Sequence, residues 1–315
     1  MNYSDILSLS TSWNIRRHTN GKDLVDEITD LGFRKLELNY NVTREMAEEI
    51  LPMVDKGRIE ITSIHNVFPK IYDESFGTDS LLLGYPDPSM RAKAVELTIG
   101  AVEYAARFNA PAVVIHPGEV PVPRDYNRLL EDMLLDGRKD TEEYRALYKE
   151  MIELRSSGSP AYVELIRQSL EQICDYIERK NYKVALGLEN RTRCYQIPVF
   201  QEVHTLLKGL EGLPVYFWYD VGHGMLLEQM GMFDNYEEAE QLVERTIGAH
   251  IHDIIDCSDH FCPYQYSDKL DKYLDIIGQI PIKVLELGRD CKPDEICRSA
   301  EILAEKLSKI SKGSQ

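Results

Sequence analysis

Histidines and acidic residues gather where this sequence predicts strands to end. Six of the eight histidines lie at or just after the carboxyl ends of predicted strands, and three acidic residues each end an otherwise apolar strand. Imidazole and carboxylate groups together are the ligands of divalent cations such as Zn²⁺, Mn²⁺, Fe²⁺ or Co²⁺. The candidate ligands are His65, His116, Glu189, Asp220, His223, His250, His260 and Glu286. We expect a metal site here, because closely packed carboxylates without a cation repel one another and take up protons.

The spacing of these residues places several of them on a common face. Side chains alternate along a strand, so His250 and His252 share one face, and Glu189 shares a face with the small residues Gly187 and Ala185. Small residues suit a crowded barrel interior, so both faces are expected to point inward. A single histidine at a strand end is more often structural than a ligand, but three carboxylates at strand ends are harder to explain in that way.

Other residues near these positions are candidates for supporting roles. His252 is expected to support the site from behind the ligands or to bind substrate. Glu37, on the second predicted strand, is expected to bind substrate or to be structural. Cys257 and Cys262 flank His260, and we interpret them as incidental because oxygen and nitrogen ligands are already numerous.

The elements that must position these residues alternate between strands and helices. Short runs rich in Val, Ile and Leu predict strands, and amphipathic segments predict helices after most of them. The predicted strands are 6–10, 34–39, 60–65, 112–116, 183–189, 215–220, 248–252 and 282–286, and the predicted helices are 22–31, 43–54, 91–108, 161–180, 200–210, 236–246 and 294–309. This order predicts an α/β fold, with a single (β/α)₈ TIM-barrel domain over 1–315. A doubly wound sheet would need a glycine-rich turn after the first strand, and residues 10–20 contain no glycine.

The longest connection in the chain, about 119–160, follows the fourth predicted strand. The carboxyl ends of barrel strands meet at one face, so this insertion and the candidate ligands are expected at the same end of the molecule. The segment begins with the proline-punctuated 117–123, continues as a charged helical stretch over 129–154, and is expected to break at 156–160. We interpret the insertion as a lid or wall over the mouth of the site, with a surface helix as the alternative.

Composition narrows the class of protein. Lys and Arg number 36 and Asp and Glu 53, so the formal net charge is 36 − 53 = −17, which disfavours nucleic acid as a partner without excluding it. The six cysteines form no C-x-x-C pair, and neither a secretory signal nor a membrane-length apolar run is present. We therefore expect a cytoplasmic protein with no membrane partner. The sequence is compatible with an oligomer.

Six motifs occur in the order of the predicted strands. They are S-I-H at 63–65, V-V-I-H-P-G at 113–118, G-L-E-N at 187–190, Y-D-V-G-H at 219–223, A-H-I-H-D at 249–253 and L-E-L-G at 285–288. Together they resemble the xylose isomerase-like TIM-barrel superfamily, which includes sugar-phosphate isomerases and epimerases as well as endonuclease IV. The resemblance spans nearly the whole chain and is specific for the fold and the metal site but not for the substrate.

The resemblance implies particular metal ligands. In the sugar isomerases and epimerases a Glu, Asp, His, Glu quartet binds the metal, and it corresponds here to Glu189, Asp220, His250 and Glu286. Endonuclease IV adds further histidines, whose positions are filled here by His65, His116, His223 and His260. It also has an Asp-x-His motif, but Ser258 stands where that Asp would be, with Asp259 displaced by one. We therefore expect one or two divalent ions, with a third in doubt.

The resemblance favours a metal-dependent isomerase or epimerase acting on a sugar or sugar phosphate. The ion would stabilise an enediolate, while Glu189 and Glu286 transfer the proton as base and acid. His223 could hydrogen-bond a substrate oxygen. The arginines just beyond strand ends, Arg191, Arg193 and Arg289, could clamp a phosphate or carboxylate, or could instead be solvated at the rim.

Two other functions remain as alternatives. Metal-dependent phosphodiester hydrolysis, as in endonuclease IV, is supported by the full set of histidines and opposed by the acidic net charge and by Ser258. A barrel that only binds a ligand or a protein is also compatible with the fold. The intact set of candidate ligands argues against that second alternative.

Overall fold

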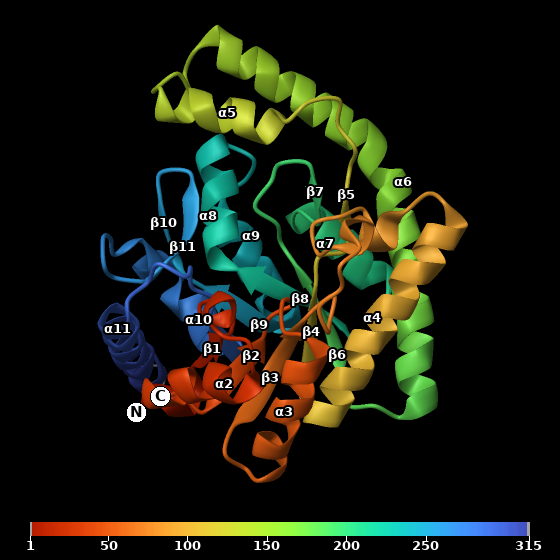
Figure 1. The fold of residues 1–315 in the computed structure, drawn as a ribbon. Coiled ribbons are helices and arrows are strands. Elements are labelled where there is room, and N and C mark those ends of the chain that lie inside the picture. Colours follow the sequence, from red (N-terminus) through yellow and green to blue (C-terminus); the bar gives the residue numbers. More distant parts are fainter. Residues whose placement is uncertain (1, 314–315) are drawn as a thin grey trace.

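Parallel strands close into a barrel at the centre of the molecule (Figure 1). The structure is a computed structural model that describes residues 2–313. The barrel strands are β1 (Ser8–Ser10), β2 (Lys35–Leu38), β3 (Glu60–His65), β4 (Ala112–Ile115), β6 (Ala185–Glu189), β8 (Val215–Asp220), β9 (Thr246–Ile251) and β12 (Ile282–Leu285). Each strand pairs in parallel with the next, and β12 pairs with β1 to close the ring. The predicted (β/α)₈ barrel is confirmed, and each predicted strand corresponds to one of these.

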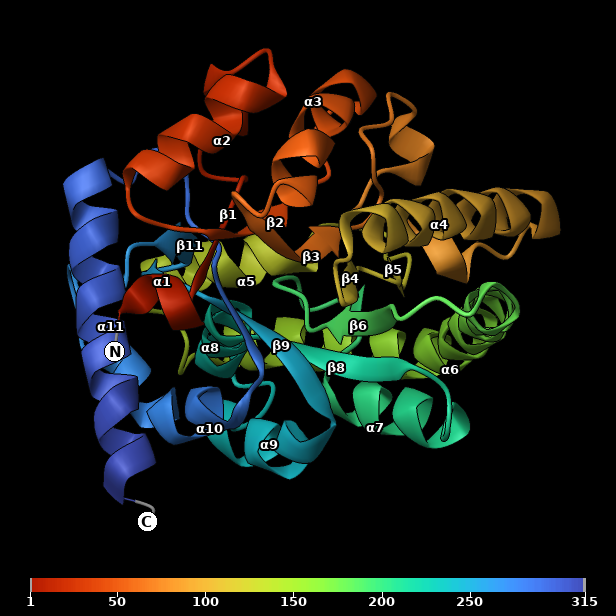
Figure 2. The same ribbon diagram turned by 90° about the horizontal axis from the view of Figure 1, so that it is seen from below.

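Helices surround the barrel (Figure 2). They are α1 (Tyr3–Ile6), α2 (Gly21–Asp30), α3 (Arg44–Asp55), α4 (Pro88–Phe108), α5 (Tyr126–Leu135), α6 (Glu142–Lys180), α7 (Phe200–Gly209), α8 (Val221–Met230), α9 (Asn235–Leu242), α10 (Leu274–Gln279) and α11 (Pro293–Gly313). Short 3₁₀ helices lie at Ile15–Arg17, Glu74–Phe76, Leu82–Gly84, Val243–Arg245 and Lys269–Tyr273. Within residues 2–313, none of the helices combines the length and apolar character needed to cross a membrane.

The predicted break at 156–160 is wrong. Helix α6 continues through Pro160, and the chain turns between α5 and α6 instead, where the Thr141 side chain caps α6 by accepting the N–H of Tyr144. In Figure 1, α6 curves from the top of the barrel down its side. A proline inside a helix loses one backbone hydrogen bond. Other contacts must therefore hold this segment in helical form.

Those contacts come from buried side chains of α6. The guanidinium of Arg155 makes two 2.7 Å hydrogen bonds to Glu202 of α7 and donates to the carbonyl oxygens of Cys194 and Gln196. Ser159, one residue before Pro160, also donates to Glu202. This buried network ties the segment to α7, and it outweighs the local signal that Ser156, Gly158 and Pro160 give in the sequence.

The insertion packs at the carboxyl end of the barrel. In Figure 1, α5 and the beginning of α6 lie above α8. A small apolar cluster joins these helices, formed by Tyr126, Leu130, Met133, Tyr144, Met151, Cys194, Leu227 and Met230. The hydroxyl groups of Tyr144 and Tyr148 each donate to carbonyl oxygens at the end of α8, at 3.0 Å. The insertion therefore has its own core and is anchored on α8.

One helix, one two-stranded ribbon and one hairpin near the carboxyl end of the barrel lie outside the predicted set. Helix α8 begins directly at the end of β8, because the Asp220 side chain accepts the N–H of His223 at 2.7 Å and caps the helix. Strands β5 (Gly118–Glu119) and β7 (Gln196–Ile197) pair as a short antiparallel ribbon. The hairpin of β10 (Asp253–Ile255) and β11 (Ser258–Phe261) follows β9 and carries His260.

Trp218 fills the barrel beneath the candidate ligands. Its ring needs the two glycines on the neighbouring strands: a Cβ at Gly187 would lie 2.9 Å from the ring, and one at Gly248 only 2.2 Å from it. With Ala112, Val114 and Val284, Trp218 forms a separate buried apolar cluster. The layer around Trp218 is thus mainly apolar, although Ser8, which pairs with Val284, hydrogen-bonds to the Thr62 hydroxyl at 2.7 Å.

Candidate metal centre

Four side chains from the ends of neighbouring strands converge at the mouth of the barrel. They are Glu189 on β6, Asp220 on β8, His250 on β9 and Glu286 just after β12, and their ligand atoms lie within 4.8 Å of one another. We call these four residues the quartet, and all four are buried. Nδ1 of His250 lies 3.2 Å from Glu286, 3.5 Å from Glu189 and 3.7 Å from Asp220. The four residues that the sequence analysis grouped are therefore neighbours.

Glu37 orients the histidine of the quartet. Nε2 of His250 lies 3.0 and 3.1 Å from the two carboxylate oxygens of Glu37 and donates to them, while the Ser63 hydroxyl also donates to Glu37 at 2.8 Å. Nδ1 of His250 is left as a buried acceptor with no hydrogen-bond partner among the described residues. A lone pair that faces three carboxylates is unfavourable unless a cation lies between them. The donor set therefore fits a divalent ion, and Glu37 supports it by fixing the imidazole.

The charge balance of the quartet shows which positive charge an ion would replace. Burial opposes ionisation of Glu189, Asp220 and Glu286, yet the neighbouring histidines hold the pKa of each carboxyl below its ordinary value. Burial also lowers the pKa of His250, but Glu286 and Glu37 outweigh it and hold that pKa well above its ordinary value. Without an ion, the quartet therefore favours a proton on His250. A metal ion would have to displace that proton.

On one side of the quartet lies a pair of histidines, which we call the His65–His116 flank. Nδ1–H of His65 donates to the carbonyl oxygen of Asn66 at 3.0 Å, and Nδ1–H of His116 donates to the Thr78 hydroxyl at 3.0 Å. Both Nε2 atoms then face Glu189, at 3.4 Å from His65 and 2.7 Å from His116. His65, His116 and Glu189 thus bring three ligand atoms within 4.8 Å of one another.

Arg191 reaches into the His65–His116 flank. Its Nη1 lies 2.6 Å from Nε2 of His116 and 3.2 Å from Oε1 of Glu189, while its Nη2 donates to Asp79 at 2.8 Å. The side chain is buried. This guanidinium is one reason why the pKa of His116 lies below its ordinary value, the larger reason being burial.

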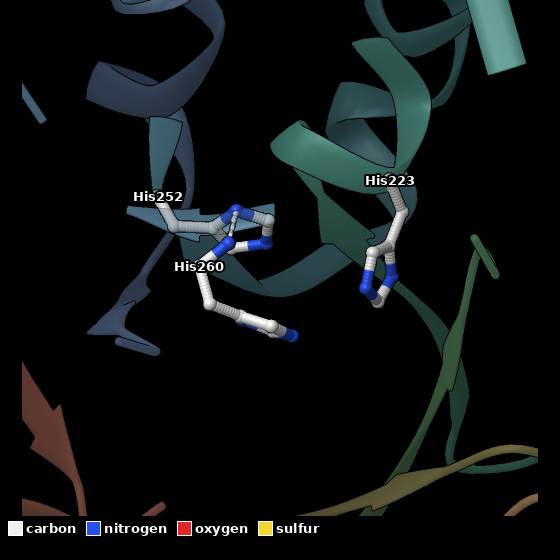
Figure 3. A group of neighbouring side chains, drawn as sticks. All are labelled: His223, His252 and His260. Carbon is white, nitrogen blue, oxygen red and sulfur yellow. Dashed lines mark hydrogen bonds between the residues drawn. The ribbon is translucent and has the colours of Figure 1, made fainter. Parts of the chain in front are cut away.

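A second group of histidines, His223, His252 and His260, also adjoins the quartet, and we call it the His223–His260 flank (Figure 3). Nδ1–H of His223 donates to the carbonyl oxygen of Asn190 at 3.1 Å, and Nδ1–H of His260 donates to that of Glu286 at 3.0 Å. Because each of these nitrogens carries the proton, Nε2 of both histidines is left with a lone pair. One nitrogen of each of His223, His252 and His260 lies within 4.8 Å of the others.

His252 differs from the two other histidines in Figure 3. Its Nδ1 accepts the backbone N–H of His260 at 3.0 Å, so its proton is on Nε2, which donates to Asp220 at 3.0 Å. Both nitrogens are therefore engaged. In this structure His252 holds a quartet carboxylate in place, the supporting role that the sequence analysis considered for it.

Asp259 compensates for Ser258. Ser258 is exposed, whereas the carboxylate of Asp259 lies 3.6 Å from Nε2 of His223 and 3.8 Å from Nε2 of His260. The displacement by one residue along β11 therefore still leaves a carboxylate beside the His223–His260 flank.

Asn190 and Tyr40 are among the site residues missed from the sequence, as are Thr78 and Asp79, which contact His116 and Arg191. The Asn190 side chain links β6 to β8, because it accepts the N–H of Asp220 and donates to the carbonyl oxygen of the same residue, both at 2.8 Å. The Tyr40 ring packs edge-on against His65 at 5.2 Å between centroids, and burial, aided by Glu286, raises the pKa of Tyr40 to about 12. Asn190 and Tyr40 each directly follow a predicted strand, which is the signal that could have identified them.

The arginines differ in placement. Arg289 is exposed and forms an ion pair with Asp290 at 3.8 Å, so it lies outside the group of buried ligands. Arg193 is exposed as well. Of the three arginines, Arg191 alone contacts the quartet in the described residues.

A pocket of about 430 Å³ opens beside the site, lined among others by Tyr40, Thr78 and Asp79.

Comparison with solved structures identifies the fold. A "D-tagatose 3-epimerase-like protein" superimposes with a TM-score of 0.69 at 16% identity, covering 98% of this chain and 100% of that one. The 3-keto-D-glucoside 4-epimerase of E. coli gives 0.64 at 12% identity, covering 95% and 98%. The D-psicose 3-epimerase of Clostridium cellulolyticum H10, solved with D-tagatose, gives 0.65 at 12% identity, covering 97% and 99%.

Sequence comparison assigns the family. No curated protein matches this chain. The family model described as "Xylose isomerase-like TIM barrel" matches residues 25–288, which span β2 through the end of β12 and include all four residues of the quartet. The chain therefore belongs to the xylose isomerase-like TIM-barrel family.

Proposed function

We propose that this protein is a divalent-metal-dependent isomerase or epimerase of a sugar or sugar phosphate. The observation that carries the proposal is the quartet, in which the unpartnered Nδ1 of His250 faces three buried carboxylates. Membership of the family supports it, as do the sugar epimerases among the structures of similar fold.

Glu189, Asp220, His250 and Glu286 would hold the ion, which we propose to be Zn²⁺, Mn²⁺, Co²⁺ or Fe²⁺ because the ligands are carboxylates and imidazole. A bound divalent ion supplies a Lewis acid that stabilises negative charge on substrate oxygens. Two further groups of ligand atoms lie beside the quartet, the His65–His116 flank and the His223–His260 flank, and the charges around each determine whether it takes a second ion.

Proton transfer falls to the two glutamates of the quartet. The depressed pKa values of Glu189 and Glu286 keep both carboxylates ionised at neutral pH, so either can accept a proton from a substrate carbon. The glutamate that takes the proton becomes a carboxylic acid, and the other, ionised at the start, must gain a proton from solvent as the substrate binds before it can return one to the opposite face of the substrate carbon. Exclusion of bulk water from these buried side chains protects the carbanion-like charge from unselective protonation.

Substrate oxygens would be bound by groups whose hydrogen-bonding capacity is unused. Nε2 of His223 has a lone pair, Nε–H of Arg191 is buried without a partner, and Tyr40 keeps its proton because its pKa is raised to about 12. We propose that these three groups contact the substrate. The contacts of Glu37 and His252 support a positioning role for both, and a role for Arg289 in binding a substrate phosphate remains a prediction.

The test is a screen of ketoses and their phosphates with the metal-loaded protein in D₂O, followed by NMR. Epimerisation or isomerisation with deuterium incorporated at the reacting carbon is the expected result. Absence of exchange with every sugar, in protein that holds the metal, would contradict the proposal.

Phosphodiester hydrolysis is the second candidate, favoured by the histidines of the two flanks. Clustered ions could activate water and stabilise the leaving oxygen of a nucleic acid. Cleavage of an abasic-site duplex by the metal-loaded protein, without sugar turnover, would replace the first proposal by this one.

A further inference from the structure

Arg191 is a buried cation placed among the ligand atoms of the His65–His116 flank. It follows Glu189 by two residues, and its side chain is 6% exposed. Asp79 holds the other end of the guanidinium at 2.8 Å. The arginine is thus fixed between a carboxylate of the loop after β3 and the quartet.

The contact with His116 removes one ligand from that flank. Nδ1 of His116 donates its proton to Thr78, because the Thr78 hydroxyl already donates to the carbonyl oxygen of Asn66 at 2.9 Å. Nε2 therefore has the lone pair, and Nη1 of Arg191 lies 2.6 Å from it. A neutral imidazole nitrogen has one lone pair, so it cannot accept this hydrogen bond and bind a metal ion at the same time.

The charge of Arg191 opposes an ion in the same place. Nε2 of His116 and Oε2 of Glu189 lie 2.7 Å apart, a hydrogen-bonding distance if Nε2 carries a proton; with the proton on Nδ1 instead, the two acceptors repel unless a positive charge lies beside them. Nη1 supplies it, because it also lies 3.2 Å from the other oxygen of Glu189. An arginine keeps its charge at physiological pH, so an ion arriving here would meet a fixed like charge.

We propose that Arg191 is an internal cation that takes the place of a second metal ion at the His65–His116 flank. The chain then binds its ion at the quartet and none between His65 and His116. This inference rests on the metal site of the proposed function and deepens it. A guanidinium neutralises charge but cannot generate a metal-bound hydroxide, so this flank positions substrate and Glu189 and does not activate water for hydrolysis.

The experiment is metal content per chain, measured after equilibration with excess Mn²⁺ or Zn²⁺ and desalting, for the wild type and for Arg191→Met. Methionine keeps the length of the side chain and removes its charge. We expect the variant to gain one ion per chain over the wild type, and anomalous scattering to place it between His65 and His116. Adding His116→Ala to Arg191→Met should abolish the gain.

Two control variants test whether a change in ion count is caused by loss of the positive charge at the His65–His116 flank or by loss of any arginine. Arg193→Met removes the same charge from an exposed side chain two residues away and should leave the ion count as in the wild type. Arg191→Lys keeps a cation and should also leave it unchanged. Thermal unfolding of each variant verifies that it is folded; if Arg191→Met is not, Arg191→Gln replaces it.

The outcomes distinguish this inference from the proposed function. An ion between His65 and His116 in the wild type, or no gain in a folded variant that lacks Arg191, would overturn the inference while leaving the quartet intact. A wild type without an ion at the quartet would overturn the metal-dependent function, whatever Arg191→Met does. A gain specific to Arg191→Met supports the internal cation.

Discussion

The two histidine flanks of the quartet use the same residue type in opposite ways. At the His65–His116 flank, a buried arginine contacts an imidazole nitrogen and a quartet carboxylate. At the His223–His260 flank, in the part of the chain that is described, no guanidinium hydrogen-bonds to the histidines, and Asp259 supplies a carboxylate beside their Nε2 atoms. The difference teaches that histidine spacing alone does not determine the number of ions. The charged side chain beside each pair of histidines also matters. A cationic side chain occupies the lone pair of a histidine, whereas a carboxylate leaves the lone pairs free to bind a ligand.

The largest effect is expected from removing a quartet carboxylate. Glu286→Gln should lower kcat by about 10³-fold, because it removes both a ligand and a proton-transfer group. Turnover of the sugar identified by the NMR screen is the measurement. Glu60→Gln is the matched control. Glu60 is exposed at the amino end of β3, away from the site at the carboxyl ends of the strands, so this variant should retain activity. Near-normal kcat in Glu286→Gln would rule out the proton-transfer role.

Glu37→Gln should weaken metal binding by about 10- to 100-fold, because the amide no longer supplies two carboxylate oxygens to Nε2–H of His250. Titration calorimetry with Mn²⁺ measures the affinity. His252→Gln, which disturbs Asp220 from the side of the His223–His260 flank, should have a smaller effect. An unchanged affinity in Glu37→Gln would show that His250 is oriented without this contact.

Metal affinity should fall as the pH is lowered. The pKa of His250 is raised in the ion-free protein, so the proton on this group competes with the ion at every pH below that raised value. Affinity then drops by about tenfold per pH unit for each proton released on binding. The same raised pKa means that protonated His250 stabilises the ion-free fold fully below the unfolded-state pKa, and this contribution is lost as the pH rises through the folded-state pKa. Calorimetry in two buffers of different ionisation enthalpy counts the protons, and a count of zero would contradict the account.

The smallest effect separates the two flanks directly. His223→Gln should lower kcat/KM by about tenfold, the loss of one substrate hydrogen bond. His116→Gln should lower it less, because the lone pair of His116 is already used by Arg191. Steady-state kinetics on the pair measures the difference. A larger loss in His116→Gln would mean that the two flanks have been assigned the wrong roles.

The strand ends could be predicted because they combine two strong signals. An apolar run predicts the strand, and a histidine or acid at its last position marks the site, as at Glu189, Asp220 and Glu286. The closure of the barrel then brings these positions together, since the carboxyl ends of parallel strands share one face. The grouping of the quartet can therefore be predicted from the strand topology alone, without knowledge of side-chain contacts.

The contacts of Arg191 and Asp259 could not be predicted in the same way. Arg191 meets Asp79 across 112 positions of sequence, and no local pattern links the two. Asp259 depends on the hairpin of β10 and β11, whose strands of three and four residues are too short to show an alternating pattern. The continuous helix through Pro160 was likewise mispredicted, because the buried contacts of Arg155 with α7 override the local propensity for a break.

The most direct test of the account is to locate the ion by anomalous scattering in crystals of the wild-type protein purified without chelator. We predict one ion, within bonding distance of Nδ1 of His250 and of the carboxylates of Glu189, Asp220 and Glu286. An ion bound elsewhere, or crystals that hold none although the protein turns over sugar, would contradict the claim that the quartet is the metal centre.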